Sequence, residues 1–190
     1  LARMRFWGSA TLATGVFLTY LIPETLLFLP LFKMFVVFGE LTGIQLINKW
    51  YVLLIVYPTL TVPFCTWIMI GYFASIPKEL DEAAIVDGCS SWAVLWRVLL
   101  PAVKPGLITV GLFAFLVAWN DFMAPLILIN DSNRMTLPLA VANLRGQVMG
   151  VIDYGATEAG VVVLALPCIV LFLVLQRHYV RGFMTGAFKG

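Results

Sequence analysis

Four long apolar stretches, separated by shorter polar segments, form the main pattern of the 190-residue sequence. They lie at about residues 7–38, 50–74, 106–129 and 159–176. A membrane-spanning helix needs about 20 mostly apolar residues, so each stretch is predicted to cross a membrane. The first is long for one span, and Pro23 and Pro30 within it predict a kink or a break. The pattern predicts an all-α integral membrane protein, with residues 1–190 forming one polytopic bundle of transmembrane helices.

Residues 75–105, between the second and third stretches, predict two short helices joined by a turn. Pro77 suits the first turn of the first helix. Gly88 is a natural helix stop, and we assign it to a left-handed turn. Ser90 or Ser91 is expected to cap the second helix. That helix carries one apolar stripe with i, i+3, i+4, i+7 spacing, formed by Trp92, Leu95, Trp96 and Leu99.

The second helix is expected to end at Pro101, while the first presents a shallow face to a partner. That face is formed by Leu80, Ala83, Ala84 and Asp87. Glu82 lies at its edge, where it could meet a cation on another protein. Two interpretations are equally open on the residues alone: a helix that transmits force to the spans, or an amphipathic connector lying on the membrane surface.

Composition narrows the class of protein. Hydrophobic residues make up 62% of the chain and charged residues 12%, and the mean hydropathy is +0.98. Soluble domains are about 45–50% apolar and about 25% charged, so a soluble enzyme is excluded. The net charge of +2 is too small to indicate a nucleic-acid partner. The three cysteines lie far apart and form no metal-binding motif.

The distribution of Lys and Arg predicts the orientation in the membrane. One side, which holds both chain ends and residues 75–105, collects twice as many Lys and Arg residues as the other. Because the richer side is normally cytoplasmic, both ends of this sequence are expected inside the cell.

The cytoplasmic segment also carries a motif. Glu82-Ala83-Ala84, three residues, Gly88, nine residues and then Val98-Leu99-Leu100-Pro101 resembles the EAA loop of ABC importer permeases, written EAA-x3-G-x9-I-x-L-P. Val98 replaces the usual Ile. Three further stretches resemble the carbohydrate-uptake branch of that family, the maltose and glycerol-3-phosphate type: residues 118–122, 134–138 and 176–190.

This resemblance implies a permease that forms half of a sugar translocation pathway in a bacterial inner membrane. The residues implied to couple it to an ATPase are Glu82, Ala83, Ala84, Asp87, Gly88 and Pro101. The implied partners are a second permease subunit that forms a heterodimer with this one, two ATP-binding cassette ATPase subunits and an extracytoplasmic solute-binding protein. The chain has no G-x-x-x-x-G-K-[ST] motif, so ATP and Mg are expected on the partner ATPase, with no cofactor on this chain. Complete members have six spans, so the first two are expected to be missing here.

Polar residues within the spans are the candidates for the substrate path. Trp119, Asn120 and Asp121 could offer a sugar an aromatic ring, an amide and a carboxylate, and Glu24 is a weaker candidate. Equally, Asn120 and Asp121 could bond to neighbouring helices and hold a kink near Pro125. Because adjacent helical positions diverge by about 100°, one of the pair is expected to face the path and the other to brace a helix, and we favour Asn120 for the path.

A different class of function is an ion- or proton-coupled secondary transporter. It would need ionisable groups along the spans or an inverted repeat. Only Glu24 and Asp121 qualify as such groups, and no repeat is found. An intramembrane enzyme would need paired aspartates, a Ser/His pair or metal ligands within the spans, which the sequence does not offer.

Overall fold

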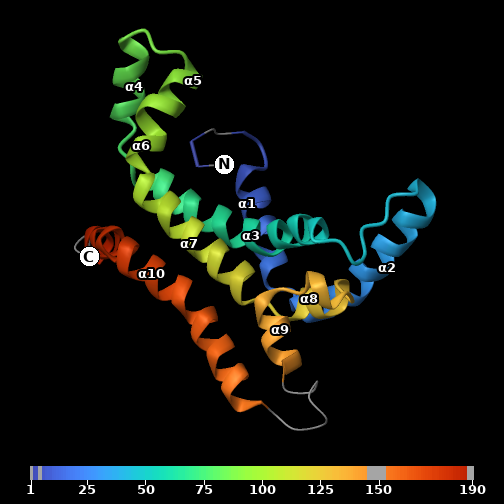
Figure 1. The fold of residues 1–190 in the computed structure, drawn as a ribbon. Helices are drawn as coiled ribbons and strands as arrows, with labels where there is room; N and C mark the ends of the chain where they lie inside the picture. The colour runs from blue at the N-terminus through green and yellow to red at the C-terminus, as the bar shows by residue number, and fades with distance from the viewer. Residues whose placement is uncertain (1, 4–5, 145–152, 188–190) are drawn as a thin grey trace. The chain divides into compact units, whose positions relative to one another are not determined.

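The computed structural model describes residues 2–3, 6–144 and 153–187 (Figure 1). Within these residues every regular element is a helix, which confirms the all-α prediction. In chain order the elements are α1 (Ser9–Tyr20), α2 (Glu24–Thr42), α3 (Tyr51–Ser75), α4 (Glu79–Val86), α5 (Ser91–Val94), a π-helical turn η1 (Leu95–Leu99), α6 (Leu100–Ala102), α7 (Lys104–Asn120), α8 (Met123–Leu128), a 3-10 turn η2 (Ser132–Arg134), α9 (Leu137–Leu144) and α10 (Tyr154–Ala187).

Among the described residues, three helices are long and apolar enough to cross a membrane: α2, α3 and the Tyr154–Gln176 part of α10. A fourth candidate is a bent pair, in which Ser91–Ala102 meets Lys104–Asn120 at an angle of 73°. These helices agree with a polytopic membrane protein by their length and composition.

The first apolar stretch contains two helices, α1 and α2, instead of one. The break falls at Pro23, because a proline disfavours helical backbone at the residue before it, here Ile22. Pro23 itself has φ −58° and ψ 117° and is the N-cap of α2. Pro30, by contrast, lies inside α2 and does not end it. The predicted break is therefore located at the first of the two prolines.

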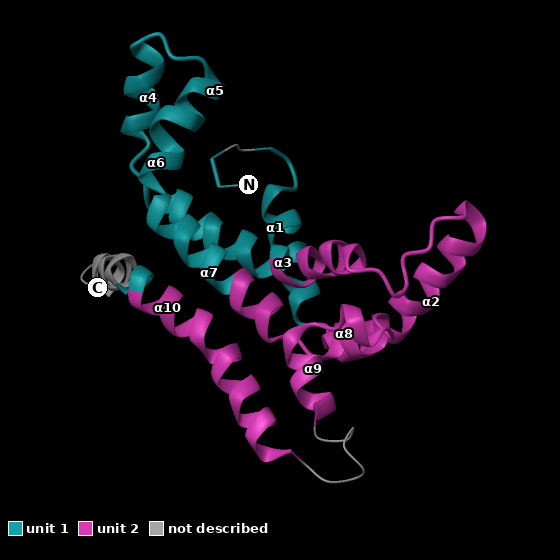
Figure 2. Ribbon diagram, viewed as in Figure 1, with its two compact units in different colours: residues 1–21, 62–113, 174–190 teal, residues 22–61, 114–173 magenta. Residues whose placement is uncertain are grey.

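The chain divides into two compact units, shown in Figure 2. Unit 1 contains residues 1–21, 62–113 and 174–190, and unit 2 contains residues 22–61 and 114–173. The helices α3, α7 and α10 each contribute residues to both units. Each unit is described separately below.

In unit 1, aromatic contacts join α1 to α3 and α3 to α7. The ring centroids of Phe17 and Trp67 lie 4.6 Å apart, those of Tyr20 and Phe64 lie 5.0 Å apart, and those of Phe64 and Phe113 lie 4.5 Å apart. These separations are within the range in which aromatic pairs attract one another.

The closest approach of α7 to α3 depends on a glycine. A Cβ built on Gly106 would lie 2.5 Å from Cγ of Tyr72, so the ring of Tyr72 occupies the space that a side chain would need. Gly106 is itself buried. The lack of a side chain at this position allows the two helices to pack at this distance.

The core of unit 2 is formed by α2, α3 and α8. Phe28 on α2 is 1% exposed, Val52 on α3 is fully buried, and Ala124 and Leu128 on α8 are fully buried. The short helix α8 therefore packs its inner face into the core of this unit.

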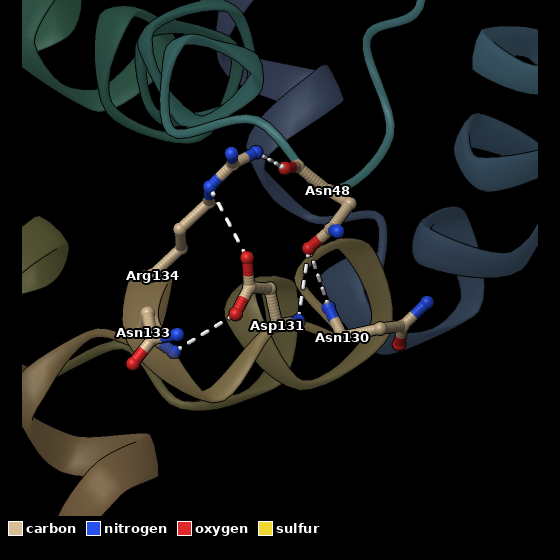
Figure 3. A network of polar contacts seen from close by, with 5 residues as sticks. All are labelled: Asn48, Asn130, Asp131, Asn133 and Arg134. Carbon is tan, nitrogen blue, oxygen red and sulfur yellow. Dashed lines mark hydrogen bonds and ion pairs between the residues drawn. The ribbon is translucent and has the colours of Figure 1, made fainter.

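A polar network connects the segment before α3 to the segment after α8 (Figure 3). The side-chain oxygen of Asn48 accepts hydrogen bonds from the backbone N–H groups of Asn130 at 3.1 Å and Asp131 at 2.9 Å. The Asn48 N–H donates to Leu128 O at 2.8 Å. Arg134 donates to Asn48 O at 2.8 Å and forms an ion pair with Asp131 at 3.3 Å. Asn48 has φ +62°, a left-handed conformation that asparagine tolerates better than most residues.

We expect the Asn48→Ala variant to lose about 2–3 kcal/mol of stability, because two backbone donors lose their acceptor and alanine is strained at positive φ. Asn48→Gly should lose less stability. Glycine adopts a positive φ without strain, although it also lacks the side-chain oxygen that accepts the two hydrogen bonds. Thermal unfolding of the detergent-solubilised protein measures both. Asn133→Ala is the matched control, because Asn133 joins the network through its backbone N–H, which alanine retains. Equal melting temperatures for Asn48→Ala and Asn133→Ala would contradict the prediction.

Candidate functional site

The segment with the EAA-like motif folds as a helical hairpin, with α4 beside α5 and the helical turns that follow it (Figure 1). Helix α4 ends at Val86, and Gly88 follows with φ +85°. The Gly88 N–H donates to Ile85 O at 2.9 Å, and the Cys89 N–H donates to Ala84 O at 3.0 Å. This pair of bonds is a Schellman motif, which needs a left-handed residue at the glycine position. The predicted left-handed turn at Gly88 is confirmed.

The second helix of the hairpin begins as expected. Ser90 is the N-cap of α5, and its side-chain oxygen accepts a hydrogen bond from the Ala93 N–H at 3.3 Å. Of the two serines proposed as caps, the structure therefore selects Ser90. Local hydrogen bonds thus fix the end of α4 before Gly88 and the first turn of α5 after it.

Further along, the second helix departs from the predicted α-helix. Leu95–Leu99 forms a π-helical turn, in which the Leu100 N–H bonds to Leu95 O, five residues back. Helical structure continues through Pro101 to Ala102, so the expectation that Pro101 ends the helix is corrected. In an α-helix the ring of Pro101 would clash with the carbonyl of the residue four positions earlier. The wider π-turn immediately before Pro101 relieves this clash.

The π-turn also changes which residues face inward. Of the four residues in the predicted stripe, Leu99 is buried, but Trp92 is 71% exposed and Trp96 is 65% exposed. The inner face of the hairpin is formed instead by Val94, Leu99 and Ala84. The regular spacing of the stripe assumed an unbroken α-helix, and the π-turn breaks that regularity.

The coupling candidates divide into an inner and an outer group. Ala84 is 8% exposed and packs inside the hairpin, so it does not share an outer face with Ala83. Pro101 lies in the helical segment that joins the hairpin to α7. Of these candidates, Glu82, Ala83, Asp87 and Gly88 are exposed, as are the apolar Ile85 and Val86 of the same helix. The structure thus gives an outer surface of acidic, small and apolar residues, with Ala84 packed behind it.

The second group of candidates lies where α7 ends. Trp119 donates its indole N–H to Leu164 O of α10 at 3.0 Å and stacks on Phe115. Asn120 is exposed, and its amide nitrogen donates to Leu116 O at 2.9 Å and lies 3.9 Å from the sulfur of Cys168. The Asn120 oxygen accepts no hydrogen bond from any residue that the structure describes.

Asp121 has a different role from its neighbour. Its two carboxylate oxygens accept hydrogen bonds from the N–H groups of Met123 at 3.1 Å and Ala124 at 3.3 Å, in the first turn of α8. It therefore caps α8, where the helix dipole favours a negative charge. The predicted third span is accordingly divided into α7 and α8, with Asp121 holding the junction.

Sequence reasoning missed Tyr57, on α3. Its hydroxyl is buried beside the Asp121 carboxylate without reaching a well-formed hydrogen bond. The two residues are 64 positions apart in the chain, and a tyrosine in an apolar helix is a common packing residue. Only the fold brings these two groups together.

The remaining candidate, Glu24, is the first residue of α2 and is exposed. Its carboxylate lies at the positive end of that helix, which is a favourable position for an acid without any ligand. Glu82 and its neighbours belong to unit 1, whereas Glu24, Trp119, Asn120 and Asp121 belong to unit 2. Among the described residues no three His, Cys, Asp or Glu side chains are grouped to hold a metal ion.

Comparison with known proteins gives relatives along the whole chain. It is 37% identical over 153 residues to the probable ABC transporter permease protein YurM of Bacillus subtilis, covering 80% of this chain and 50% of YurM. It is 32% identical over 189 residues to the trehalose transport system permease protein SugB of Mycobacterium tuberculosis, covering all of this chain and 67% of SugB. The chain thus spans half to two thirds of the length of these relatives.

A solved structure and a family model agree with these relatives. A chain from a bacterial ABC transporter involved in the import of the acidic polysaccharide alginate superposes with a TM-score of 0.65 at 20% identity, covering 93% of this chain and 64% of that one, which shows a common fold. The family model described as "binding-protein-dependent transport system inner membrane component" matches residues 1–184. The chain therefore belongs to the family of inner membrane components of binding-protein-dependent transport systems.

Proposed function

We propose that this chain is part of the permease of an ATP-driven, binding-protein-dependent sugar importer. The observation that carries this proposal is the hairpin of α4 and α5, which presents an outward surface of acidic, small and apolar residues between apolar helices. Family membership supports it, as does the naming of a relative along the full chain as a trehalose transport permease. The substrate class we propose is therefore a sugar.

The hairpin is suited to transmit movement because it is rigid. Its two helices share a small apolar core, and the Schellman motif and the Ser90 cap fix the turn between them. A surface held in this way moves as one body when a partner displaces it. We propose that an ATPase subunit binds Glu82, Ala83, Asp87 and Gly88, and that ATP and Mg are held by that subunit. Ala84 packs inside the hairpin, and Pro101 lies in the helical segment that connects the hairpin to α7.

Asn120 is our candidate for contact with the sugar. It is exposed at the end of α7, and its amide oxygen is open among the described residues. An amide both donates hydrogen bonds to sugar hydroxyls and accepts them. Trp119 and Asp121 hold the surrounding helices and so position Asn120. Glu24 contributes charge at the start of α2.

The remaining parts of the complex follow from this assignment. We propose a second permease subunit to complete the pathway, two ATPase subunits on the side of the hairpin, and a solute-binding protein on the opposite side. With the hairpin in the cytoplasm of a bacterial cell, both ends of this sequence are also cytoplasmic, in agreement with the positive-inside rule.

The test is sugar uptake and ATP hydrolysis by the complete transporter in proteoliposomes. We expect Glu82→Lys to reduce uptake at least tenfold, because opposing like charges across an interface cost several kcal/mol. Gly88→Leu should act similarly, since a β-carbon is strained at φ +85° and the turn must rearrange. Both variants should insert into the membrane in normal amounts.

Two controls make the test specific. Glu79→Lys places the same charge change on an exposed residue of the same helix that lies outside the proposed contact. Gly88→Asn introduces a side chain whose residue type still tolerates a left-handed backbone. Glu79→Lys should transport near the parent rate, and Gly88→Asn should transport better than Gly88→Leu. Normal uptake with Glu82→Lys and Gly88→Leu would show that the hairpin does not couple to the ATPase.

A further inference from the structure

Arg3, in the segment before α1, is bonded to both ends of the connection between α3 and α4. Its guanidinium donates to the carbonyl of Ile76 at 2.7 Å and forms an ion pair with Asp81 at 3.3 Å. The side chains of Arg3 and Asp81 are only 17% and 22% exposed. One residue thus joins three segments that are separate along the chain.

The chemistry of these contacts explains why an arginine suits this position. Ile76 follows the last residue of α3, where carbonyl groups lack helical partners and a positive charge is favourable. Asp81 lies in the first turn of α4. The planar guanidinium has several donors in fixed directions, so it can bind a carbonyl and a carboxylate at once. A lysine has no comparable fork.

Water cannot easily take the place of the contact between Arg3 and Asp81. Arg3 Nε and Asp81 Oδ1 are both buried without a hydrogen-bond partner in the described structure. Exposed ion pairs contribute little to stability. A largely buried pair behaves differently, because removing one partner leaves the other charge uncompensated in a poorly hydrated place. The contact is therefore expected to persist while the hairpin moves.

Arg3 and its neighbour Ala2 also lie beside α3 and the hairpin. Ala2 and Arg3 line a groove of about 670 Å³ together with Phe73, Asp81, Ile85 and other hairpin residues. Arg3 therefore ties the first turn of α4 to the carbonyl at the end of α3, in addition to the backbone that connects the two helices.

We propose that Arg3 and Asp81 are positioning residues for coupling: the contacts of Arg3 hold the first turn of α4 against the end of α3, so that movement of the hairpin is transmitted to α3. This inference rests on the proposed function, in which an ATPase displaces the hairpin. It adds a second connection between α4 and α3, through a residue outside the EAA-like motif.

The experiment measures the number of sugar molecules imported per ATP hydrolysed, using the complete transporter in proteoliposomes and normalising to the amount of assembled complex. The variants are Arg3→Ala, Asp81→Asn, the double variant and Arg3→Lys. We expect each single variant to lower this ratio roughly fivefold, the lower end of typical coupling between sites. The double variant should be no worse than the more affected single one, because both remove the same contact. Arg3→Lys should recover the ratio only in part.

Glu79→Gln is the matched control, since it removes an exposed carboxylate from the same turn of α4 as Asp81, and its ratio should equal that of the parent. A normal ratio in Arg3→Ala and Asp81→Asn, even with reduced assembly, would overturn the inference and leave the contact a purely structural one. Additive losses in the double variant would also overturn it. A parent complex that does not import sugar when ATP is hydrolysed would instead contradict the proposed function.

Discussion

The variant Gly106→Leu is expected to assemble poorly in the membrane, because α7 and α3 can no longer approach each other. Even a Cβ at this position would lie 2.5–2.8 Å from three atoms of the Tyr72 ring. These are the ring atoms nearest the backbone of α3, so a small rotation of Tyr72 does not clear them. Overpacking of this kind costs about 1–3 kcal/mol and more where the backbone must move. The amount of folded protein, measured by fluorescence-detected gel filtration, should fall several-fold.

Gly111→Leu is the control, since Gly111 lies on the same helix and a Cβ there would meet nothing within 4 Å. Its yield should stay close to that of the parent. A size exchange provides the positive test: combining Gly106→Ala with Tyr72→Ala empties the space that the new methyl group needs. If Gly106→Leu folds as well as Gly111→Leu, the contact between Gly106 and Tyr72 does not determine how the two helices pack.

The second large effect is expected for Asp121→Ala. This change removes the acceptor for two N–H groups at the start of α8, a helix whose other face is buried in the core of unit 2. Loss of a capping side chain costs about 0.5–2 kcal/mol, and the part-buried N–H of Ala124 would also lose its acceptor. The yield of folded protein should therefore drop. Asp121→Asn, which keeps an acceptor oxygen, should retain most of it.

Asn120→Ala supplies the contrast. Asn120 is exposed and bonds mainly within its own helix, so its loss should leave the yield unchanged and alter sugar uptake or substrate preference. Yield is measured as for Gly106, and uptake with the complete transporter. If Asp121→Ala is produced normally while Asn120→Ala is not, the roles of these two neighbours are reversed.

Local sequence signals predicted the parts of the candidate site that depend on local chemistry. The preferences of single residues predict the left-handed stop at Gly88 and a cap at Ser90 or Ser91; hydrogen bonds within five residues confirm the first and select Ser90 for the second. The inward position of Ala84 was not predicted. Ala84 packs against Val94 and Leu99. The π-turn at Leu95–Leu99 gives Leu99 a different direction from the one that a continuous α-helix predicts.

Contacts between distant segments account for the rest. Asn48 follows Ile47 in a short loop and resembles any turn residue in the sequence. Its importance comes from Asn130, Asp131 and Arg134, which lie more than 80 positions later. Tyr57 beside Asp121 and Arg3 beside Asp81 follow the same rule. Hydrophobic periodicity predicts helices and their faces, but it does not specify which polar side chains meet.

The π-turn at Leu95–Leu99 gives the hairpin an unusual sensitivity to length. A helical turn closed by a bond to the fifth residue back holds one residue more than an α-helical turn. Deleting one residue here would permit regular α-helical bonding and would keep the chain helical. The shorter turn would still complete about one revolution, so the segment before the deletion would keep its direction, but the ring of Pro101 would then meet the carbonyl of the residue four positions earlier. In this segment the number of residues, as much as their identity, decides whether a proline can lie within the helix.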